Sequence, residues 1–151
     1  MKPTTKTAII AIIAGLAAFG LIIFAVWLLT LGEDNEDEKE KDNIVTRIID
    51  GDTFQLSNNG TVRLICVDAP EKGKTGADES ASFLSEMILD KPVRLEKDKT
   101  EEDEYGRLLR YVYVNISGVE LFVNQQLVQE GYAKLFRYGN DTTKCDEIEF
   151  A

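Results

Sequence analysis

Residues 44–74 read IVTRIIDGDTFQLSNNGTVRLICVDAPEKGK, and this stretch decides the fold. Two runs rich in β-branched residues, Ile44–Ile49 and Val62–Val67, predict short strands, and Thr53–Ser57 lies between them. Asn58-Asn59-Gly60 is a turn signal and predicts a hairpin. The chain after residue 44 therefore starts as closely spaced strands joined by tight turns.

Charged side chains stand around these runs. Asp50, Asp52, Asp68 and Glu71 lie near strand ends, whereas Arg63 lies within a run. Carboxylates that converge repel one another, so such a cluster needs a cation between them. An arginine close by indicates that the cation also meets a second anion, such as a phosphate. The pattern predicts a metal-assisted site for a phosphate-containing substrate.

The rest of the chain alternates strand and helix patterns. Ala81, Leu84 and Ile88 recur at helical spacing and predict an amphipathic helix over Asp78–Leu89. Further strands are predicted at Pro92–Glu96 and Leu108–Val114, a loop at Lys97–Glu104, a turn at Asn115–Gly118 and a second helix at Leu121–Glu130 with Gly131 as its C-cap. Asp141–Ala151 offers at most the first turns of a third helix. Composition alone supports an α+β domain.

An uncharged apolar segment, Thr7–Leu31, precedes this domain. At about 1.5 Å per residue it is long enough to cross a hydrocarbon layer of about 30 Å. Residues 1–6 carry Lys2 and Lys6, so the positive-inside rule leaves them in the cytoplasm and the rest of the chain outside. An uncleaved transmembrane anchor is favoured over a cleaved signal peptide. If the segment is cleaved, the domain is secreted. Residues 32–43 are expected to form an acidic linker, followed by the domain at 44–151.

Composition excludes several kinds of chemistry. The chain has no His, which excludes Ser-His-Asp triads and His-containing zinc sites. Its formal charge is −10, the wrong sign for tight non-specific binding to nucleic acid, although a small positive pocket remains compatible with it. Cys66 and Cys145 could pair outside the cell, but the sequence does not fix their distance, so two unpaired thiols are the expectation adopted.

Four segments carry a resemblance to a known family. IIDGDTFQL, VRLICVDAPE, DEYGRLLRYVYV and VNQQLVQEGYAKL, in this order between Ile44 and Tyr138, are similar to the staphylococcal nuclease (thermonuclease) family. The resemblance implies a mainly β fold of the α+β class. Its expected architecture is a five-stranded OB-type barrel with two or three helices, here preceded by an N-terminal transmembrane helix.

The resemblance also implies Ca²⁺ as the cofactor. Asp52, Asp68 and the backbone carbonyl of Ala69 match the family's calcium ligands, and such an all-oxygen set suits Ca²⁺ or Mg²⁺. With only two carboxylate ligands, the affinity for the metal ion is expected to be weak. Asp50 is expected to be an outer-shell or turn residue.

Catalytic and substrate-binding roles follow from the same matches. Arg63 and Arg107 match residues that grip the scissile phosphate, and Glu71 matches the residue usually assigned as general base. The expected substrate contacts are Tyr105 near the nucleotide, Tyr138 stacked on a base, and Lys72 and Lys74 as a local positive field. Arg110 matches no motif position and is expected to be structural.

The implied function is calcium-dependent hydrolysis of DNA and RNA that leaves 3′-phosphate ends, by a monomer outside the membrane. Two other functions stay open. A catalytically inactive OB-type module would bind nucleic acid without cutting it. An exported interaction protein would instead use its acidic surface to bind cations or partners.

Overall fold

The computed structural model describes residues 43–149. The expected membrane-spanning segment Thr7–Leu31 and residues 32–42 of the acidic linker lie outside this range. Between residues 43 and 149, no helix is both long and apolar enough to span a membrane.

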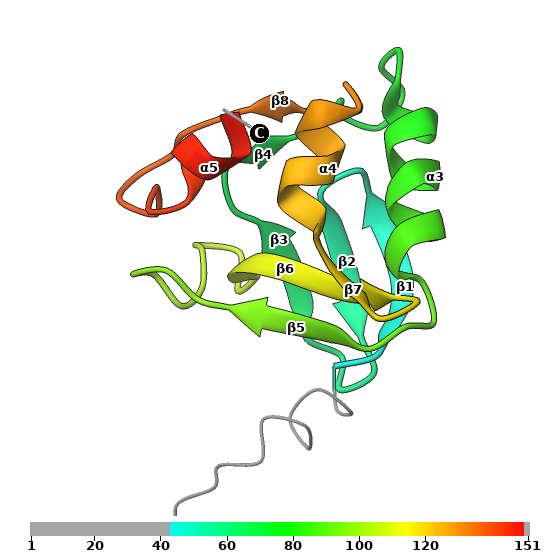
Figure 1. Ribbon diagram of the computed structural model, residues 1–151. Coiled ribbons are helices and arrows are strands. Elements are labelled where there is room, and N and C mark those ends of the chain that lie inside the picture. The colour runs from blue at the N-terminus through cyan, green and yellow to red at the C-terminus, as the bar shows by residue number, and fades with distance from the viewer. Residues whose placement is uncertain (1–42, 150–151) are drawn as a thin grey trace, which may run out of the picture. The chain divides into compact units, whose positions relative to one another are not determined.

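The described chain is mainly β, with three short helices. Its strands are β1 (Val45–Asp50), β2 (Thr53–Leu56), β3 (Thr61–Leu64), β4 (Val67–Asp68), β5 (Val93–Glu96), β6 (Leu108–Ile116), β7 (Val119–Phe122) and β8 (Lys134–Leu135). Its helices are α3 (Ala77–Ile88), α4 (Val123–Gln129) and α5 (Cys145–Glu149). The main sheet has the order β1-β2-β3-β6-β5 with β7 paired to β6, and β4 and β8 form a separate small sheet (Figure 1).

Backbone contacts between the first and last strands of that order close the sheet into a barrel. Ile44 forms an antiparallel bridge with Pro92, directly before β5. The Val45 N–H donates to Lys91 O at 3.1 Å, and the Val93 N–H donates to Asn43 O at 3.1 Å. The five strands β1, β2, β3, β6 and β5 thus form a ring, and the expected five-stranded barrel is confirmed.

The strand register brings the acidic turn and Arg63 together. Arg63 on β3 pairs with Thr53 on β2, which follows the turn between β1 and β2. On its other side, β3 runs parallel to β6, with Arg63 beside Leu109. The backbone of Arg63 therefore lies between β2 and β6, close to the acidic turn.

Two predicted elements differ from the structure. The run Val62–Val67 is not one strand, because Cys66 adopts a left-handed conformation (φ 62°) that separates β3 from β4. The predicted helix Leu121–Glu130 begins two residues late, at Val123, because Val119–Phe122 pairs with β6 as β7. A tight turn through Ser117 and Gly118, both with positive φ, makes that pairing possible.

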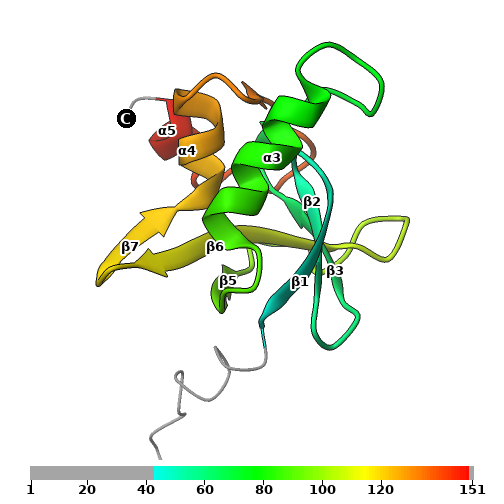
Figure 2. The ribbon, with the colours of Figure 1, turned by 90° about the vertical axis from the view of Figure 1, so that its right-hand side faces the viewer.

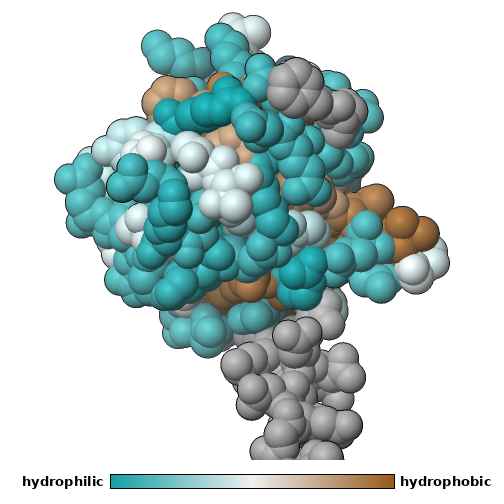
Figure 3. All heavy atoms as spheres, turned by 60° about the vertical axis from the view of Figure 1, so that its left-hand side comes forward, coloured by the Kyte–Doolittle hydropathy of each residue, from teal (hydrophilic) through white to brown (hydrophobic). Residues whose placement is uncertain are grey.

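The helices cover the barrel. Figure 2 shows α3 lying across β1, on which it packs, while α4 packs against β6 and α3. The main core combines the inward faces of the barrel strands with the buried sides of these two helices. Its fully buried members include Val45, Phe54, Val62, Leu84, Ile88, Val93, Val112, Val123 and Leu127. The face drawn in Figure 3 is covered mainly by hydrophilic residues.

A second cluster on the outer face of β6 holds the C-terminal segment. Tyr111 and Tyr113 lie on this face and pack with Phe122 and with Ile148 of α5. Cys66 and Cys145 are joined by a disulfide with their Cα atoms 5.5 Å apart. The expectation of two unpaired thiols was therefore wrong, because α5 folds back onto the connection between β3 and β4.

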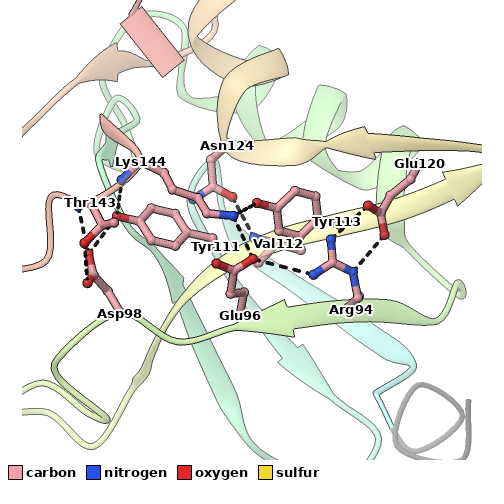
Figure 4. Close-up of polar contacts among 10 residues, drawn as sticks. All are labelled: Arg94, Glu96, Asp98, Tyr111, Val112, Tyr113, Glu120, Asn124, Thr143 and Lys144. Atoms are coloured by element: carbon pink, nitrogen blue, oxygen red, sulfur yellow. Dashed lines mark hydrogen bonds and ion pairs between the residues drawn. The ribbon is translucent and has the colours of Figure 1, made fainter. Parts of the chain in front are cut away.

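Polar contacts fasten the same segment (Figure 4). Lys144 Nζ donates to Glu96 Oε2 at 2.7 Å and to the Tyr113 hydroxyl at 2.6 Å. The Lys144 N–H donates to the Tyr111 hydroxyl at 3.1 Å, and that hydroxyl donates to Asp98 Oδ2 at 2.9 Å. Asp98 also accepts the Thr143 hydroxyl at 2.7 Å. The last described residues are thus integral to the fold.

Candidate functional site

The turn between β1 and β2 carries the first acidic pair. Asp50 Oδ1 accepts the Asp52 N–H at 3.1 Å, which makes Asp50 the residue that shapes the turn. Gly51 lies against helix α3: a Cβ atom here would be 2.0 Å from Ser80 Oγ and 2.7 Å from Ala69 Cβ. The turn is therefore held between α3 and the segment that follows β4.

Asp52 is a buried carboxylate with three polar partners. Its Oδ2 accepts the Ala69 N–H at 2.8 Å and lies 3.1 Å from Arg63 Nη2, and its Oδ1 accepts the Thr53 hydroxyl at 2.9 Å. Burial nevertheless raises the pKa of Asp52 to about 6, against the lowering effects of the Arg63 charge and the Ala69 N–H. The nearby charge of Asp50 raises it further. The positive charge around Asp52 therefore does not fully offset the cost of burying its ionised carboxylate.

Arg63 links the two acidic segments. Its Nη1 donates to Leu64 O at 2.8 Å and to Val67 O at 2.7 Å. Its Nη2 lies 3.1 Å from Asp52 Oδ2 and 3.8 Å from Asp68 Oδ1. These contacts fix the plane of the guanidinium and bring Asp52 and Asp68 to the same cationic nitrogen.

Asp68 is the accessible member of the group. Its side chain is 51 % exposed, whereas that of Asp52 is only 8 % exposed. It lies on β4 and pairs across the small sheet with Lys134 of β8. A pocket of about 290 Å³ opens beside Asp68 and is also lined by Pro70, Thr75 and Tyr132. The Asp68 side of the group is therefore open to solvent.

These residues fit a calcium ion in part. Asp52 and Asp68 converge within 4 Å of one Arg63 nitrogen, and both offer the hard oxygen ligands that Ca²⁺ prefers. Within residues 43–149, however, no group of three or more His, Cys, Asp or Glu residues is arranged to hold a metal. The donor set is that of a weak site, in which water, a backbone carbonyl or substrate must complete the coordination shell.

Glu71, Lys72 and Lys74 lie in the exposed turn after Pro70. The Lys74 N–H donates to Glu71 O at 2.9 Å and closes this turn. In the described part of the chain, the Glu71 side chain makes no hydrogen bond or ion pair with Asp52, Arg63 or Asp68. Glu71 thus follows Asp68 by three residues in the chain, but within residues 43–149 its side chain does not contact the cluster of Asp52, Arg63 and Asp68.

Arg107 lies directly before β6, and its guanidinium pairs with Asp103 Oδ2 at 2.7 Å and lies 5.3 Å from the centre of the Tyr105 ring. Leu109, two residues on, is the register partner of Arg63. Side chains alternate along a strand, so the position of Arg107 extrapolates to the same face as Arg63. No direct contact joins the two arginines in the described residues.

The remaining predicted residues are exposed or structural. Tyr105 and Tyr138 are 76 % and 74 % exposed, and the Tyr138 ring lies nearly parallel to that of Phe136, with centroids 6.3 Å apart. Both tyrosines are thus accessible to a substrate. Arg110 donates to Glu101 O and Leu109 O and pairs with the Glu101 carboxylate, in agreement with the structural role predicted for it.

Sequence reasoning missed several residues around the site. The pairing of Lys134 with Asp68 depends on strands far apart in sequence, and the contact of Ser80 with Gly51 depends on how α3 packs. Neither has a local signal. Asp103 could have been found, because an Asp shortly before a Gly typically accepts backbone N–H groups of a turn, as Asp103 does from Tyr105 and Arg107.

Comparison with known proteins identifies several relatives. The profile of the staphylococcal nuclease homologue family matches residues 61–151. The thermonuclease of Staphylococcus hyicus is 37 % identical over 116 residues, which cover 71 % of this chain and 66 % of that protein. The micrococcal nuclease of Shigella flexneri is 32 % identical over 154 aligned positions, covering 96 % of this chain and 81 % of that protein. The endonuclease YncB of Bacillus subtilis is 33 % identical, but this chain covers 58 % of its length.

The chain thus spans just under two thirds of the Staphylococcus hyicus relative. The part matched by the family profile includes Arg63, Asp68 and Arg107.

Proposed function

Because the chain belongs to the staphylococcal nuclease family, we propose that it is a calcium-dependent nuclease that hydrolyses DNA and RNA and leaves 3′-phosphate ends. One observation carries the proposal. The buried Asp52 and the accessible Asp68 converge on a single Arg63 nitrogen, beside a pocket open to substrate. Such a concentration of opposite charge suits a cation and a phosphate diester together.

In this proposal Asp52 and Asp68 hold the calcium ion, with the carbonyl of Ala69 as a further ligand. When bound, calcium polarises the phosphate and lowers the cost of its developing charge. Asp52 is ready for this role because its carboxylate is buried, already desolvated and short of positive charge.

Arg63 and Arg107 bind the phosphate and stabilise its additional negative charge in the transition state. Arg63 is well suited, since two backbone carbonyls orient its guanidinium. Arg107 must exchange its contact with Asp103 for the phosphate. Glu71 accepts the proton of the attacking water, a role that its exposed position near Asp68 allows. Tyr105, Lys72, Lys74 and Tyr138 contact the rest of the substrate strand.

We further propose that the enzyme is a monomer that acts outside the cytoplasm, attached to the membrane by Thr7–Leu31 or released from it. The Cys66–Cys145 disulfide supports the location outside the cytoplasm, because such bonds persist in oxidising compartments. Protease digestion of intact cells tests it: an exported domain is cleaved, whereas a cytoplasmic one survives until the cells are lysed.

The nuclease proposal is tested with the full-length chain and fluorescent single-stranded DNA and RNA, in calcium or in a chelator. We expect cleavage only with calcium, and a loss of about 10²–10⁴-fold in Glu71→Gln. Glu79→Gln removes an exposed carboxylate from α3 and serves as the matched control. Products with 3′-phosphate ends become primers for a polymerase only after phosphatase treatment.

The main alternative is a module that binds nucleic acid without cutting it, and the same assay separates the two. Binding in both calcium and chelator, with intact oligonucleotide after long incubation, would establish the alternative. If the chain neither binds nor cleaves the oligonucleotide, an exported interaction protein is the remaining candidate function.

A further inference from the structure

The pocket beside Asp68 is built from two separate segments. One is the connection from β4 to α3, which supplies Pro70 and Thr75, and the other is the connection from α4 to β8, which supplies Tyr132 and Lys134. Its volume of about 290 Å³ is near the lower end of the range for small-molecule pockets. One nucleoside is the size of ligand that such a pocket takes.

Lys134 brings a positive charge to this pocket. It lies opposite Asp68 in the antiparallel pair of β4 and β8. Directly opposed side chains of such a pair project to the same face, with Cβ atoms about 4.5–5.5 Å apart. Lys134 is exposed, and among residues 43–149 its ammonium group forms no ion pair or hydrogen bond. In a chain with a formal charge of −10, an uncommitted ammonium next to a proposed calcium ligand is an anion-binding feature.

An aromatic side chain held by packing also lines the pocket. The Tyr132 ring stacks on Phe83 of α3 with centroids 4.2 Å apart and an angle of 18° between the planes. One face of the ring is thus occupied, and packing restricts its rotation. Tyr132 lines the pocket together with Pro70 and Thr75, so sugar and base meet a preformed, mostly uncharged surface.

We propose that this pocket is a subsite for the nucleotide adjacent to the scissile phosphate, and that Lys134 binds that nucleotide's outer phosphate. The proposal rests on the nuclease function above, since a strand cut beside Asp68 must continue past it. It assigns to Lys134 and the pocket the binding of longer substrates, and leaves the chemistry to the Asp52–Arg63–Asp68 cluster.

Two variants of the full-length chain test the subsite. Lys134→Ala removes the charge, and Thr75→Trp fills the pocket without changing charge. Lys97→Ala is the matched control, because Lys97 is an exposed lysine, paired with Glu101, that does not line the pocket. Each is assayed for kcat and KM on a dinucleoside monophosphate, which has only the scissile phosphate, and on a hexanucleotide.

We expect Lys134→Ala to raise KM for the hexanucleotide by about tenfold more than for the dinucleotide, with kcat little changed. The slope of log affinity against log salt, measured with the hexanucleotide in a chelator, should fall by about 0.7. Thr75→Trp should raise KM on both substrates while the salt slope stays the same. Lys97→Ala should give the wild-type preference for the longer substrate.

Equal losses on both substrates in Lys134→Ala, or a loss confined to kcat, would overturn the subsite and show that Lys134 acts through Asp68. Wild-type KM in both variants would also overturn it, while cleavage by the wild type would keep the nuclease proposal intact. If the wild type neither binds nor cleaves the hexanucleotide, the nuclease proposal itself fails, and the subsite fails with it.

Discussion

Ser80 of α3 lies so close to Gly51 that a Cβ atom on Gly51 would be 2.0 Å from Ser80 Oγ. The Ser80 hydroxyl is fully buried and has no hydrogen-bond partner among the described residues. Its role is therefore one of size and not of hydrogen bonding. Any larger side chain on either partner would push the acidic turn away from Ala69, which donates its N–H to Asp52.

Gly51→Ala should destabilise the protein by about 1–3 kcal/mol, because the added methyl group overlaps Ser80 and Ala69. Urea unfolding in a chelator measures this loss without contributions from metal binding. Ser80→Ala is the control and should be neutral or stabilising, since it removes an unpartnered hydroxyl. Full stability in Gly51→Ala would mean that α3 packs less tightly on the turn.

Arg63→Ala should lower both stability and activity. It leaves the buried Asp52 carboxylate without its nearest cation, which costs about 3 kcal/mol by comparison with other broken buried pairs. Loss of the phosphate contact should reduce kcat by about 10²–10³-fold. Arg63→Lys should recover part of the stability but little activity, because a single ammonium cannot replace the planar fork.

Urea unfolding and steady-state cleavage assays test the Arg63 variants, with Arg47→Ala on the exposed side of β1 as the control. Arg47→Ala should be unchanged in both assays. Unaltered stability in Arg63→Ala would show that Asp52 does not depend on the guanidinium for charge balance.

The sequence predicted the local part of this fold well. The predicted strand Leu108–Val114 and the helical stripe of α3 are confirmed, because each depends on residues close together in the chain. The start of α4 was misplaced, because Leu121 and Phe122 fit an apolar helical pattern until the pairing of β7 with β6 is known. The break at Cys66 has no composition signal, since a positive φ is unusual for a cysteine.

In the candidate site, too, features set by the local sequence were predicted, whereas those set by distant strand pairing were not. The cluster of Asp52, Arg63 and Asp68 was predicted from acids at strand ends and is found in close contact. The roles of Glu71 and Arg107 stay predictions, since neither contacts the cluster within the described residues. Lys134 could not be predicted, because it lies opposite Asp68 only through a strand pairing between residues more than sixty positions apart.

Reduction of the Cys66–Cys145 disulfide should destabilise the protein by about 4 kcal/mol. The bond closes a loop with a sequence separation of 79, and long loops gain the most from closure. Urea unfolding with and without a dithiol reductant measures the difference. Cys66→Ala/Cys145→Ala should be destabilised from the outset and insensitive to the reductant. A wild type equally stable in both conditions would contradict the bond.

Acid should loosen the C-terminal segment, which stays tethered by the Cys66–Cys145 disulfide. Asp98 accepts hydrogen bonds from Thr143 and Tyr111, and Asp141 Oδ1 accepts the N–H groups of Lys99 and Thr100, both at 2.8 Å. Burial acts to raise the pKa of both carboxyls, but these hydrogen bonds outweigh it, so each pKa lies below the usual 3.8.

A lowered folded-state pKa stabilises the fold above the unfolded value, and this contribution disappears as the pH falls through the folded value. We therefore expect the segment to stay docked at pH 5 and to loosen below about pH 4. Amide hydrogen exchange of residues 141–149 as a function of pH, corrected for intrinsic rates, measures the release. Asp98→Asn/Asp141→Asn should exchange faster already at pH 6, with little further change in acid. If the wild type remains as protected at pH 3 as at pH 6, these two carboxylates do not hold the segment in place.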